Sequence, residues 1–388
     1  MKYSIILYGI SLEGEKFYYK YKDILDIQYC IDRKEQALFH GYSVFKLTEK
    51  IEDLNKHLII VTATMSVYEE IKKELTSIGL REFENFIPCT AFGKKLAIVY
   101  GNCHMSTLAL YLQQNYYFNS EYFIRFYYIG EWETPSEKEL KKCDLLITQD
   151  IREKNEFNMP SYMSLVSDIK KEALVVIVPN LYGCNLFFPQ CNNVDLTLNV
   201  RQHFEKEAIS TDNYNDVQKQ RIRVSVNSIG KRDACIDSLY LKGFSQESIV
   251  DKILNQSLYT DEEIKDNFNK QIEKLKEREE ECSFKISDFI IDNYQNMQLF
   301  YEPYHPTEQI IIEKARRILQ IIDVPYDEGV MLPRNLDAME MPIYGCVKKA
   351  LNMKVVQKLM RRNCATTLGN SPITIKEYVS DYIKWNWE

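Results

Sequence analysis

The sequence predicts an α/β fold with parallel sheets, because strand and helix signals alternate along most of the chain. Short apolar runs rich in β-branched residues predict strands, and several are followed by a turn and by apolar residues at helical spacing. Polar residues also gather after the predicted strands, which is where ligands bind in open parallel sheets. The 388 residues, 45% hydrophobic and 27% charged, are enough for two or three globular domains.

Residues 1–93 are predicted to form a small Rossmann-like domain. The expected strands are Tyr3–Tyr8, Ile27–Ile31 and Leu58–Val61, and the expected second helix is Val67–Ile78. Gly9 and Gly14 follow the first strand and Asp32 follows the second, as in a dinucleotide-binding fingerprint. Ser11 stands where the middle glycine of that fingerprint is expected, so the match is partial. A nucleotide site and a purely structural role both stay open, and NAD chemistry is not expected.

Residues 94–330 are predicted to form a second α/β domain with a helical insertion at about 200–285, followed by a helical extension at 331–388. The expected strands are Leu96–Tyr100, Tyr122–Tyr128, Asp144–Asp150 and Leu174–Val178. Capping boxes at Ser136–Glu139 and Thr260–Glu263 predict two helix starts. Further helices are expected at Ile310–Ile321, Val347–Leu351 and Val355–Arg362, and the charged run Lys274–Glu281 is expected to be a solvated helix face.

The segment Gly101-Asn102-Cys103-His104 separates a buried strand from a helix, with Ser106 or Thr107 available near the helix start. A thiol at a helix N-terminus is favoured as the thiolate by the helix dipole. Cys103 is therefore the first candidate nucleophile. The alternative is that Cys103 is a small packing residue, as most cysteines after buried strands are.

A carboxylate precedes a histidine by three residues in Glu302-Pro303-Tyr304-His305-Pro306, just before the predicted helix Ile310–Ile321. Such a carboxylate can orient the imidazole and stabilise its cation, so that His305 can serve as a general base. Without a partner, a histidine in such a turn is more often a surface or capping residue. The pairing of Glu302 with His305 and the presence of Cys103 elsewhere in the chain favour the interpretation that His305 is catalytic.

Composition narrows the function classes. The net charge of −7 argues against a general affinity for nucleic acid or for an anionic membrane surface. No apolar run is long enough to span a bilayer, and the N-terminal segment shows no signal-peptide cleavage site. The ten cysteines are scattered without a C-x-x-C pair, which predicts reduced thiols, a cytoplasmic location and no metal site.

These motifs together resemble the WcbI-type polysaccharide biosynthesis proteins. The matching segments are Gly101–His104, Leu146–Asp150, Val178–Tyr182 running to Phe188-Pro189, His305-Pro306 and Met341–Tyr344. The resemblance covers about residues 95–350. It implies a fold similar to that of SGNH hydrolases and an acetyltransferase that uses coenzyme A, or acetyl-CoA as substrate, to modify capsular or cell-surface polysaccharides.

The resemblance also implies roles for individual residues. Cys103 would be the nucleophile, with Glu302 and His305 as its catalytic partners. Oxyanion or substrate contacts are expected from Asn102, His104, Gln149, Asn180 and Gly183. Contacts with coenzyme A are expected from Gly101, Ser106 and Tyr182. The acyl group would pass either through Cys103 or directly to a sugar hydroxyl that His305 deprotonates.

In the motif that resembles the family, His104 replaces the commoner glutamine, which leaves its role open. The chain departs from the hydrolase pattern because it lacks a Gly-Asp-Ser and a clear Gly-x-Asn-Asp segment. These departures argue against simple esterase activity. Two alternatives stay open: a carbohydrate esterase or deacetylase, and a non-catalytic sugar- or nucleotide-binding component of polysaccharide assembly. The expected partner is a sugar or polysaccharide precursor, while peripheral membrane contact and homo-oligomerisation are undecided.

Overall fold

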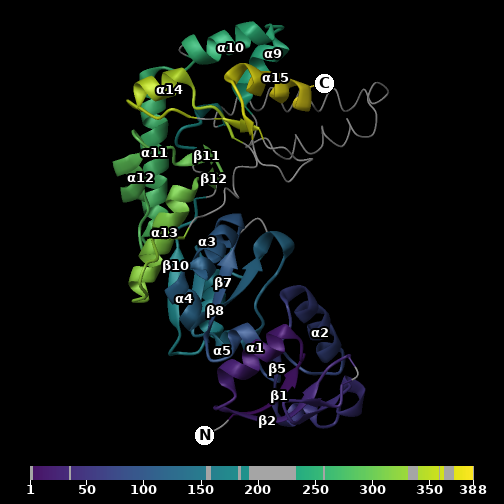
Figure 1. The fold of residues 1–388 in the computed structure, drawn as a ribbon. Coiled ribbons are helices and arrows are strands. Elements are labelled where there is room, and N and C mark those ends of the chain that lie inside the picture. The colour runs from purple at the N-terminus through teal and green to yellow at the C-terminus, as the bar shows by residue number, and fades with distance from the viewer. Residues whose placement is uncertain are drawn as a thin grey trace.

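The computed structural model is an α/β protein with two parallel sheets and a helical region (Figure 1). It describes residues 3–34, 36–153, 159–181, 185–191, 233–256, 258–330, 340–357, 359–361 and 371–387. The six-stranded sheet lies at the end that carries the N-terminus, the four-stranded sheet lies in the middle, and helices α9, α10, α14 and α15 lie at the other end (Figure 1). None of the helices in these ranges combines the length and the apolar character needed to cross a bilayer.

The six-stranded sheet has the order β3-β4-β2-β1-β5-β6 and is parallel except for the β3–β4 pair. Its strands are β1 (Tyr3–Tyr8), β2 (Leu25–Ile31), β3 (Leu38–Phe39), β4 (Tyr42–Phe45), β5 (Leu58–Val61) and β6 (Phe86–Pro88). Helix α1 (Leu12–Tyr21) packs on one face and α2 (Met65–Ser77) on the other, because alternate residues of β1 point to opposite faces. The strands and the second helix predicted for this region are confirmed.

Close backbone packing accounts for the glycines that follow β1. A Cβ on Gly9, whose φ is +105°, would lie 2.7 Å from the carbonyl oxygen of Thr62, and one on Gly14 would lie 2.5 Å from that of Gly9. The carboxylate of Asp32 accepts the backbone N–H groups of Ile10 at 2.9 Å and Lys34 at 2.7 Å. These contacts support the structural alternative for the partial dinucleotide fingerprint.

The four-stranded sheet is parallel throughout and has the order β10-β9-β7-β8. Its strands are β7 (Lys95–Gly101), β8 (Tyr122–Tyr128), β9 (Leu145–Gln149) and β10 (Leu174–Val178). The first strand in sequence, β7, lies between β8 and β9. The chain therefore adds β8 on one side of β7 and then crosses to add β9 and β10 on the other side. This reversal makes the carboxyl end of β7 a topological switch point, where ligands bind in sheets of this kind.

Helices cover both faces of this sheet and give it three layers. Helices α3 (Cys103–Gln114) and α13 (Glu308–Ile321) share one core with the sheet, and α5 (Glu137–Lys142) and α6 (Tyr162–Asp168) share the core on the opposite face. The short helix α4 (Tyr116–Glu121) leads into β8. The 3-10 turns are η1 (Leu47–Glu49), η2 (Leu54–Lys56), η3 (Cys89–Ala91), η4 (Ile129–Glu131) and η5 (Pro189–Cys191).

The helical region is built from two separate parts of the chain that pack into one core. Its helices are α9 (Ala234–Leu241), α10 (Gln246–Asn255), α11 (Asp261–Glu279), α12 (Ser287–Asn293), α14 (Gly345–Ala350) and α15 (Ile375–Asn386). The capping boxes at Ser136 and Thr260 are confirmed. The predicted boundaries at 93/94 and 330/331 stay predictions, and the second one runs through this shared core.

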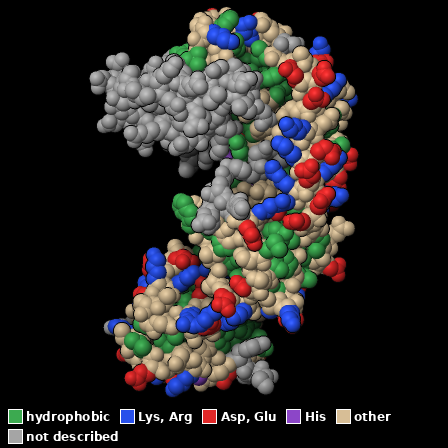
Figure 2. Space-filling view, turned by 180° about the vertical axis from the view of Figure 1, so that it is seen from behind, with side chains coloured by type: hydrophobic (Ala, Val, Ile, Leu, Met, Phe, Trp, Pro, Cys, Tyr) green, Lys and Arg blue, Asp and Glu red, His purple; other side chains and the backbone are tan. Residues whose placement is uncertain are grey.

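Two local predictions are wrong. Of the predicted helix Val355–Arg362, the described residues 355–357 and 359–361 form no helix. Gln357 instead bonds the backbone of Met341 and Ile343, and β13 (Met360–Arg361) pairs with β14 (Ser371–Pro372). The charged run in α11 is not entirely solvated either, because Glu279 is buried and bonds the start of α12. Acidic and basic side chains nevertheless lie intermingled on the side of the molecule that the long helices form (Figure 2).

Candidate active site

The turn after β7 places Cys103 at the first position of helix α3. Asn102 is the N-cap, and its side-chain oxygen accepts the backbone N–H of His104 at 3.0 Å. The helix therefore begins at Cys103. This start lies three residues before Ser106, which the sequence had suggested as a residue near the helix start. As a result Cys103 lies at the positive end of the helix dipole.

Gly101 lets neighbouring chain segments approach this turn closely. A Cβ at this position would lie 2.4 Å from Cγ of Met105 and 3.0 Å from Oε1 of Gln149. Gly101 is buried, so its visible contribution is to packing, and its predicted contact with coenzyme A stays a prediction.

His305 and Glu302 come from a small hairpin rather than from an irregular turn. Strands β11 (Phe300–Glu302) and β12 (His305–Pro306) pair antiparallel just before α13. His305 Nε2 lies 3.5 Å from Cys103 Sγ, and His305 Nδ1 lies 2.7 Å from Glu302 Oε1. The fold thus brings the three residues predicted to be catalytic into one line, although Cys103 and His305 are 202 positions apart.

Glu302 is buried and fixed by the hairpin itself. Its Oε2 accepts the backbone N–H of Tyr304 at 3.0 Å, which leaves Oε1 facing the imidazole of His305. Burial by itself lowers the pKa of His305, but its contacts with Cys103 and Glu302 outweigh burial and raise that pKa to about 9. The imidazolium is therefore favoured near neutral pH, so a proton from Cys103 can be held on His305.

His104 is buried beneath the turn and bonds the hairpin that carries His305. Its side chain is 1% exposed, and its Nε2 lies 2.5 Å from the carbonyl oxygen of Tyr304. Burial, with the charges of Lys314 and His305, holds the pKa of His104 well below its usual value, so the ring is neutral and donates to that carbonyl. His104 thus joins α3 to the hairpin that carries His305, and its predicted contact with substrate or an oxyanion stays a prediction.

Gln149 and Asn180 brace the carboxyl ends of the strands. Gln149 is fully buried, its Oε1 accepts the backbone N–H of Asn102 at 3.2 Å, and its Nε2 donates to Asn180 Oδ1 at 2.9 Å. Both ends of the Gln149 amide are thus occupied, which suits a positioning role better than the predicted oxyanion role. The roles of both residues stay predictions.

The backbone N–H of Cys103 is the amide of this turn that is left for an oxyanion. The amides of Asn102 and His104 bond side-chain oxygens, and those of Met105 and Ser106 bond the carbonyl oxygen of Asn102 at 2.9 and 3.1 Å. Within the described residues, no acceptor is found for the amide of Cys103. A helix N-terminus that keeps one N–H unpaired beside a nucleophile is suited to stabilising developing negative charge.

Other predicted and unpredicted positions complete the site. Tyr182 and Gly183 lie outside the described residues, so their predicted contacts stay predictions. Tyr128 was not predicted: it pairs with Gly101 across β8 and β7, and burial, then the nearby Cys103, raises its pKa. Its position at the end of the strand beside β7 is the sequence signal that could have revealed it. Across the described ranges, no three His, Cys, Asp or Glu side chains group to hold a metal ion.

Comparisons with known proteins identify the family of this chain. The family model described as "Polysaccharide biosynthesis enzyme WcbI" matches residues 96–204 and 232–327, together more than half of the chain. A solved structure described as WcbI, a novel polysaccharide biosynthesis enzyme, in a native form without a disulfide bond between coenzyme A and a cysteine of that protein, is similar at 16% identity and a TM-score of 0.49. The match covers 75% of this chain and 89% of that one, whereas no curated protein matches. This chain therefore belongs to the WcbI family of polysaccharide biosynthesis enzymes.

Proposed function

We propose that this enzyme transfers an acyl group, with acetyl as the expected case, from acyl-CoA to a sugar hydroxyl during polysaccharide biosynthesis. The observation that carries the proposal is the alignment of Cys103, His305 and Glu302, with contacts of 3.5 and 2.7 Å. A thiol paired with an imidazole that a buried carboxylate orients is the machinery of covalent acyl transfer. The thioester donor follows from the family resemblance, and the acceptor follows from the family's part in polysaccharide synthesis.

The proposed reaction has two balanced steps. Cys103 gives its proton to His305 and its Sγ attacks the thioester carbonyl. The bond from that carbonyl to the sulfur of coenzyme A then breaks, and His305 passes the proton to the departing thiolate. His305 then takes the proton of the sugar hydroxyl, whose oxygen attacks the acyl group and releases Cys103. In both steps the carbonyl oxygen gains negative charge, which the backbone N–H of Cys103 would stabilise.

The charge on His305 suits the first step. Because its pKa is raised to about 9, the imidazolium is available at neutral pH as the acid that protonates the leaving thiolate. Glu302 stabilises that cation and keeps Nδ1 engaged, so that Nε2 faces the reacting sulfur.

Intact-mass measurement after mixing the full chain with acetyl-CoA tests the covalent step. We expect a mass gain of one acetyl group and release of coenzyme A, both lost in Cys103→Ala and retained in the control Cys89→Ala, whose thiol lies beside the six-stranded sheet. Acyl transfer to a sugar acceptor that survives Cys103→Ala but not His305→Ala would overturn the covalent route in favour of direct attack.

The alternatives give other results in the same experiment. Release of acetate at an equal rate with and without a sugar acceptor would identify a hydrolase. Unchanged polysaccharide acylation in cells that carry the Cys103→Ala, His305→Ala double variant would identify a non-catalytic component.

A further inference from the structure

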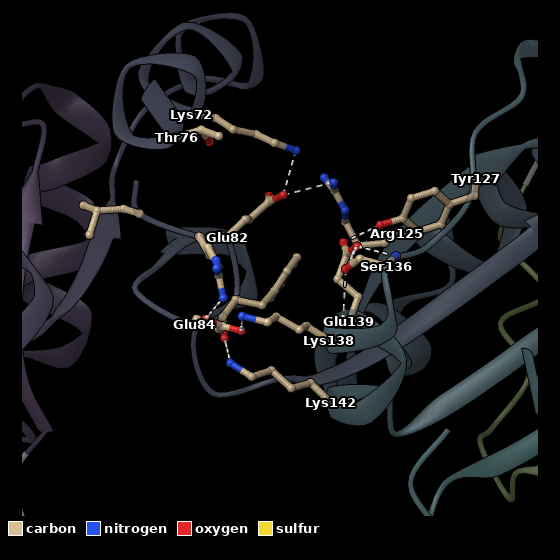
Figure 3. A pocket seen from close by; sticks show the side chains of 13 residues that line it. Lys72, Thr76, Glu82, Glu84, Arg125, Tyr127, Ser136, Lys138, Glu139 and Lys142 are labelled. Carbon is tan, nitrogen blue, oxygen red and sulfur yellow. Dashed lines mark hydrogen bonds and ion pairs between the residues drawn. The ribbon is translucent and has the colours of Figure 1, made fainter. Parts of the chain in front are cut away.

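A pocket of about 440 Å³ lies between the two sheets, away from the catalytic residues. Helix α2 and the segment that follows it form one wall, and β8 and α5 form the other (Figure 3). Arg125 on β8 pairs with Ile98, three residues before the end of β7, which places it about 10 Å below the carboxyl end of the sheet. Tyr127, two residues further on the same face, packs with α5 rather than with α3, so the pocket and Cys103 lie on opposite faces.

The lining of this pocket carries more positive than negative charge. Its cationic residues are Lys72, Arg81, Arg125, Lys138 and Lys142, and its carboxylates are Glu82, Glu84 and Glu139. This excess stands out in a chain whose net charge is −7. A local excess of charge in a concave site attracts small ions of the opposite sign.

On one side of the pocket, Glu82 forms ion pairs with two cations, Lys72 and Arg125, and Glu139 adds a further attraction to Arg125. Glu82 lies 2.6 Å from Lys72 Nζ and 3.0 Å from a terminal nitrogen of Arg125, and it also accepts the hydroxyl of Tyr68 (Figure 3). The guanidinium of Arg125 lies over the rings of Phe83 and Tyr127, at 5.7 and 5.9 Å, and these rings hold it in place. A guanidinium has five N–H donors, and one carboxylate leaves part of that capacity for a ligand.

The opposite side repeats this imbalance. Glu84 lies 3.2 Å from Lys138 Nζ and 3.7 Å from Arg81, while the ammonium of Lys142 donates to the uncharged carbonyl of Phe83. Burial lowers the pKa of Lys142 by more than Glu84 raises it. The ammonium of Lys142 is therefore incompletely compensated, and an anion beside it would restore the balance.

We propose that this pocket binds a small phosphate-bearing anion. Its volume lies in the range of small-molecule sites, and its position between two packed units is a common place for such sites. The cations gather on two sides of the pocket, Lys72 and Arg125 on one and Lys138 and Lys142 on the other. This arrangement fits a phosphate or diphosphate group, which has several acceptor oxygens. The group can belong to a free inorganic ion or to a sugar phosphate, because the recognised chemistry is the same.

Calorimetric titration of the full chain at constant ionic strength tests the proposal with three probes: inorganic phosphate, pyrophosphate and glucose 1-phosphate. We expect saturable binding of at least one probe. Binding of glucose 1-phosphate but not of the inorganic ions would assign the site to sugar phosphates, and the reverse would assign it to the free ions. Absence of saturable binding for all three would overturn the proposal.

Matched variants separate the pocket from general electrostatics. Lys138→Gln and Lys142→Gln remove lining charges from α5, and each should weaken binding about tenfold. Lys141→Gln removes the same charge from the same helix, but Lys141 is 63% exposed and pairs with Glu137, so binding should change less than about twofold. An equal loss in all three variants would overturn the assignment to this pocket.

Glu84→Gln provides a test with the opposite sign. The carboxylate of Glu84 competes with an anion for Lys138, so its removal should strengthen binding several-fold. A purely structural role for this cluster predicts no gain in affinity from that change. Weaker binding in Glu84→Gln, measured with the protein folded, would contradict the proposal.

Discussion

Asn102 sets the position of the candidate nucleophile, because its side chain caps the helix that begins at Cys103. Asn102→Ala should lower the free energy of unfolding by about 1 kcal/mol, whereas Asn102→Asp, which keeps a capping oxygen, should cost much less. Urea denaturation of the three proteins measures the difference. Equal losses in both variants would show that the cap is not the origin of the effect.

His305 should control the reactivity of Cys103, since the two side chains are 3.5 Å apart. We expect His305→Gln to slow alkylation of Cys103 by iodoacetamide at neutral pH by about tenfold, because Cys103 loses the imidazole that can take its proton. Mass spectrometry of the peptide that contains Cys103 measures this rate directly. An unchanged rate would contradict a coupled thiol–imidazole pair.

The raised pKa of His305 also makes a prediction about stability. Its pKa is about 9 in the folded chain against an ordinary 6.5, so the folded state binds the proton more tightly. The resulting stabilisation is fully present below about pH 6.5 and is lost as the pH rises through about 9. The difference in unfolding free energy between the wild type and His305→Gln should therefore shrink across this window. A difference that grows with pH would have the wrong sign.

At this scale the sequence predicted the three candidate catalytic residues, which the fold brings together, better than the residues that support them. Cys103 and the Glu302–His305 pair were recognisable because each occupies a local context with few alternatives. The burial of His104 depends on the carbonyl of Tyr304, which is 200 positions away and leaves no local pattern. The N-cap was equally hard to choose, because Asn102, Ser106 and Thr107 all have side chains that can cap a helix.

Within helix α11, Glu279 has a structural task that its charged surroundings concealed. It is 2% exposed, its Oε1 accepts the backbone N–H groups of Ile286 and Ser287 at 2.7 and 2.9 Å, and its Oε2 accepts the hydroxyl of Ser287. Glu279→Ala should lower the free energy of unfolding by about 3 kcal/mol. The adjacent, exposed Glu280→Ala is the matched control and should cost less than about 0.5 kcal/mol. Similar losses from the two changes would refute this task.

A signal for Glu279 was nevertheless present in the sequence. It continues the buried positions Phe268, Ile272 and Leu275 of α11 at helical spacing. The predicted helix at Val355–Arg362 failed for another reason. Helical spacing there competes with bonds from the Gln357 side chain to backbone at 341 and 343, and such tertiary contacts override local preference.

At the scale of the whole molecule, buried polar contacts join parts of the helical region that are far apart in sequence. The side chain of Asp233 caps α9 and accepts the hydroxyl of Tyr344 at 2.6 Å, where α14 begins. Tyr344→Phe should lower the free energy of unfolding by about 2 kcal/mol, because it leaves a buried carboxyl with fewer partners. Tyr117→Phe, on the exposed side of α4, is the control, and thermal or urea unfolding measures both. A loss of unfolding free energy no greater than in the control would show that this contact does not stabilise the fold.

The alternation of strands and helices was sufficient to predict two parallel sheets and the end of the sheet that carries the site. It was not sufficient to predict that residues 340–387 complete the core formed by residues 233–300, because no local pattern records which helices pack together. The predicted helical extension at 331–388 thus shares its core with the predicted helical insertion.

The distance in sequence between Cys103 and His305 also has a consequence for how the enzyme is made. During synthesis the thiol leaves the ribosome 202 residues before the imidazole, and the hairpin that carries the imidazole is held by a later residue, Met341, whose N–H bonds Tyr301 at 2.9 Å. A nascent chain therefore carries Cys103 before it carries the imidazole that contacts it. Under the proposed mechanism, unfinished chains would lack the Cys103–His305 pair and would be protected from premature acylation.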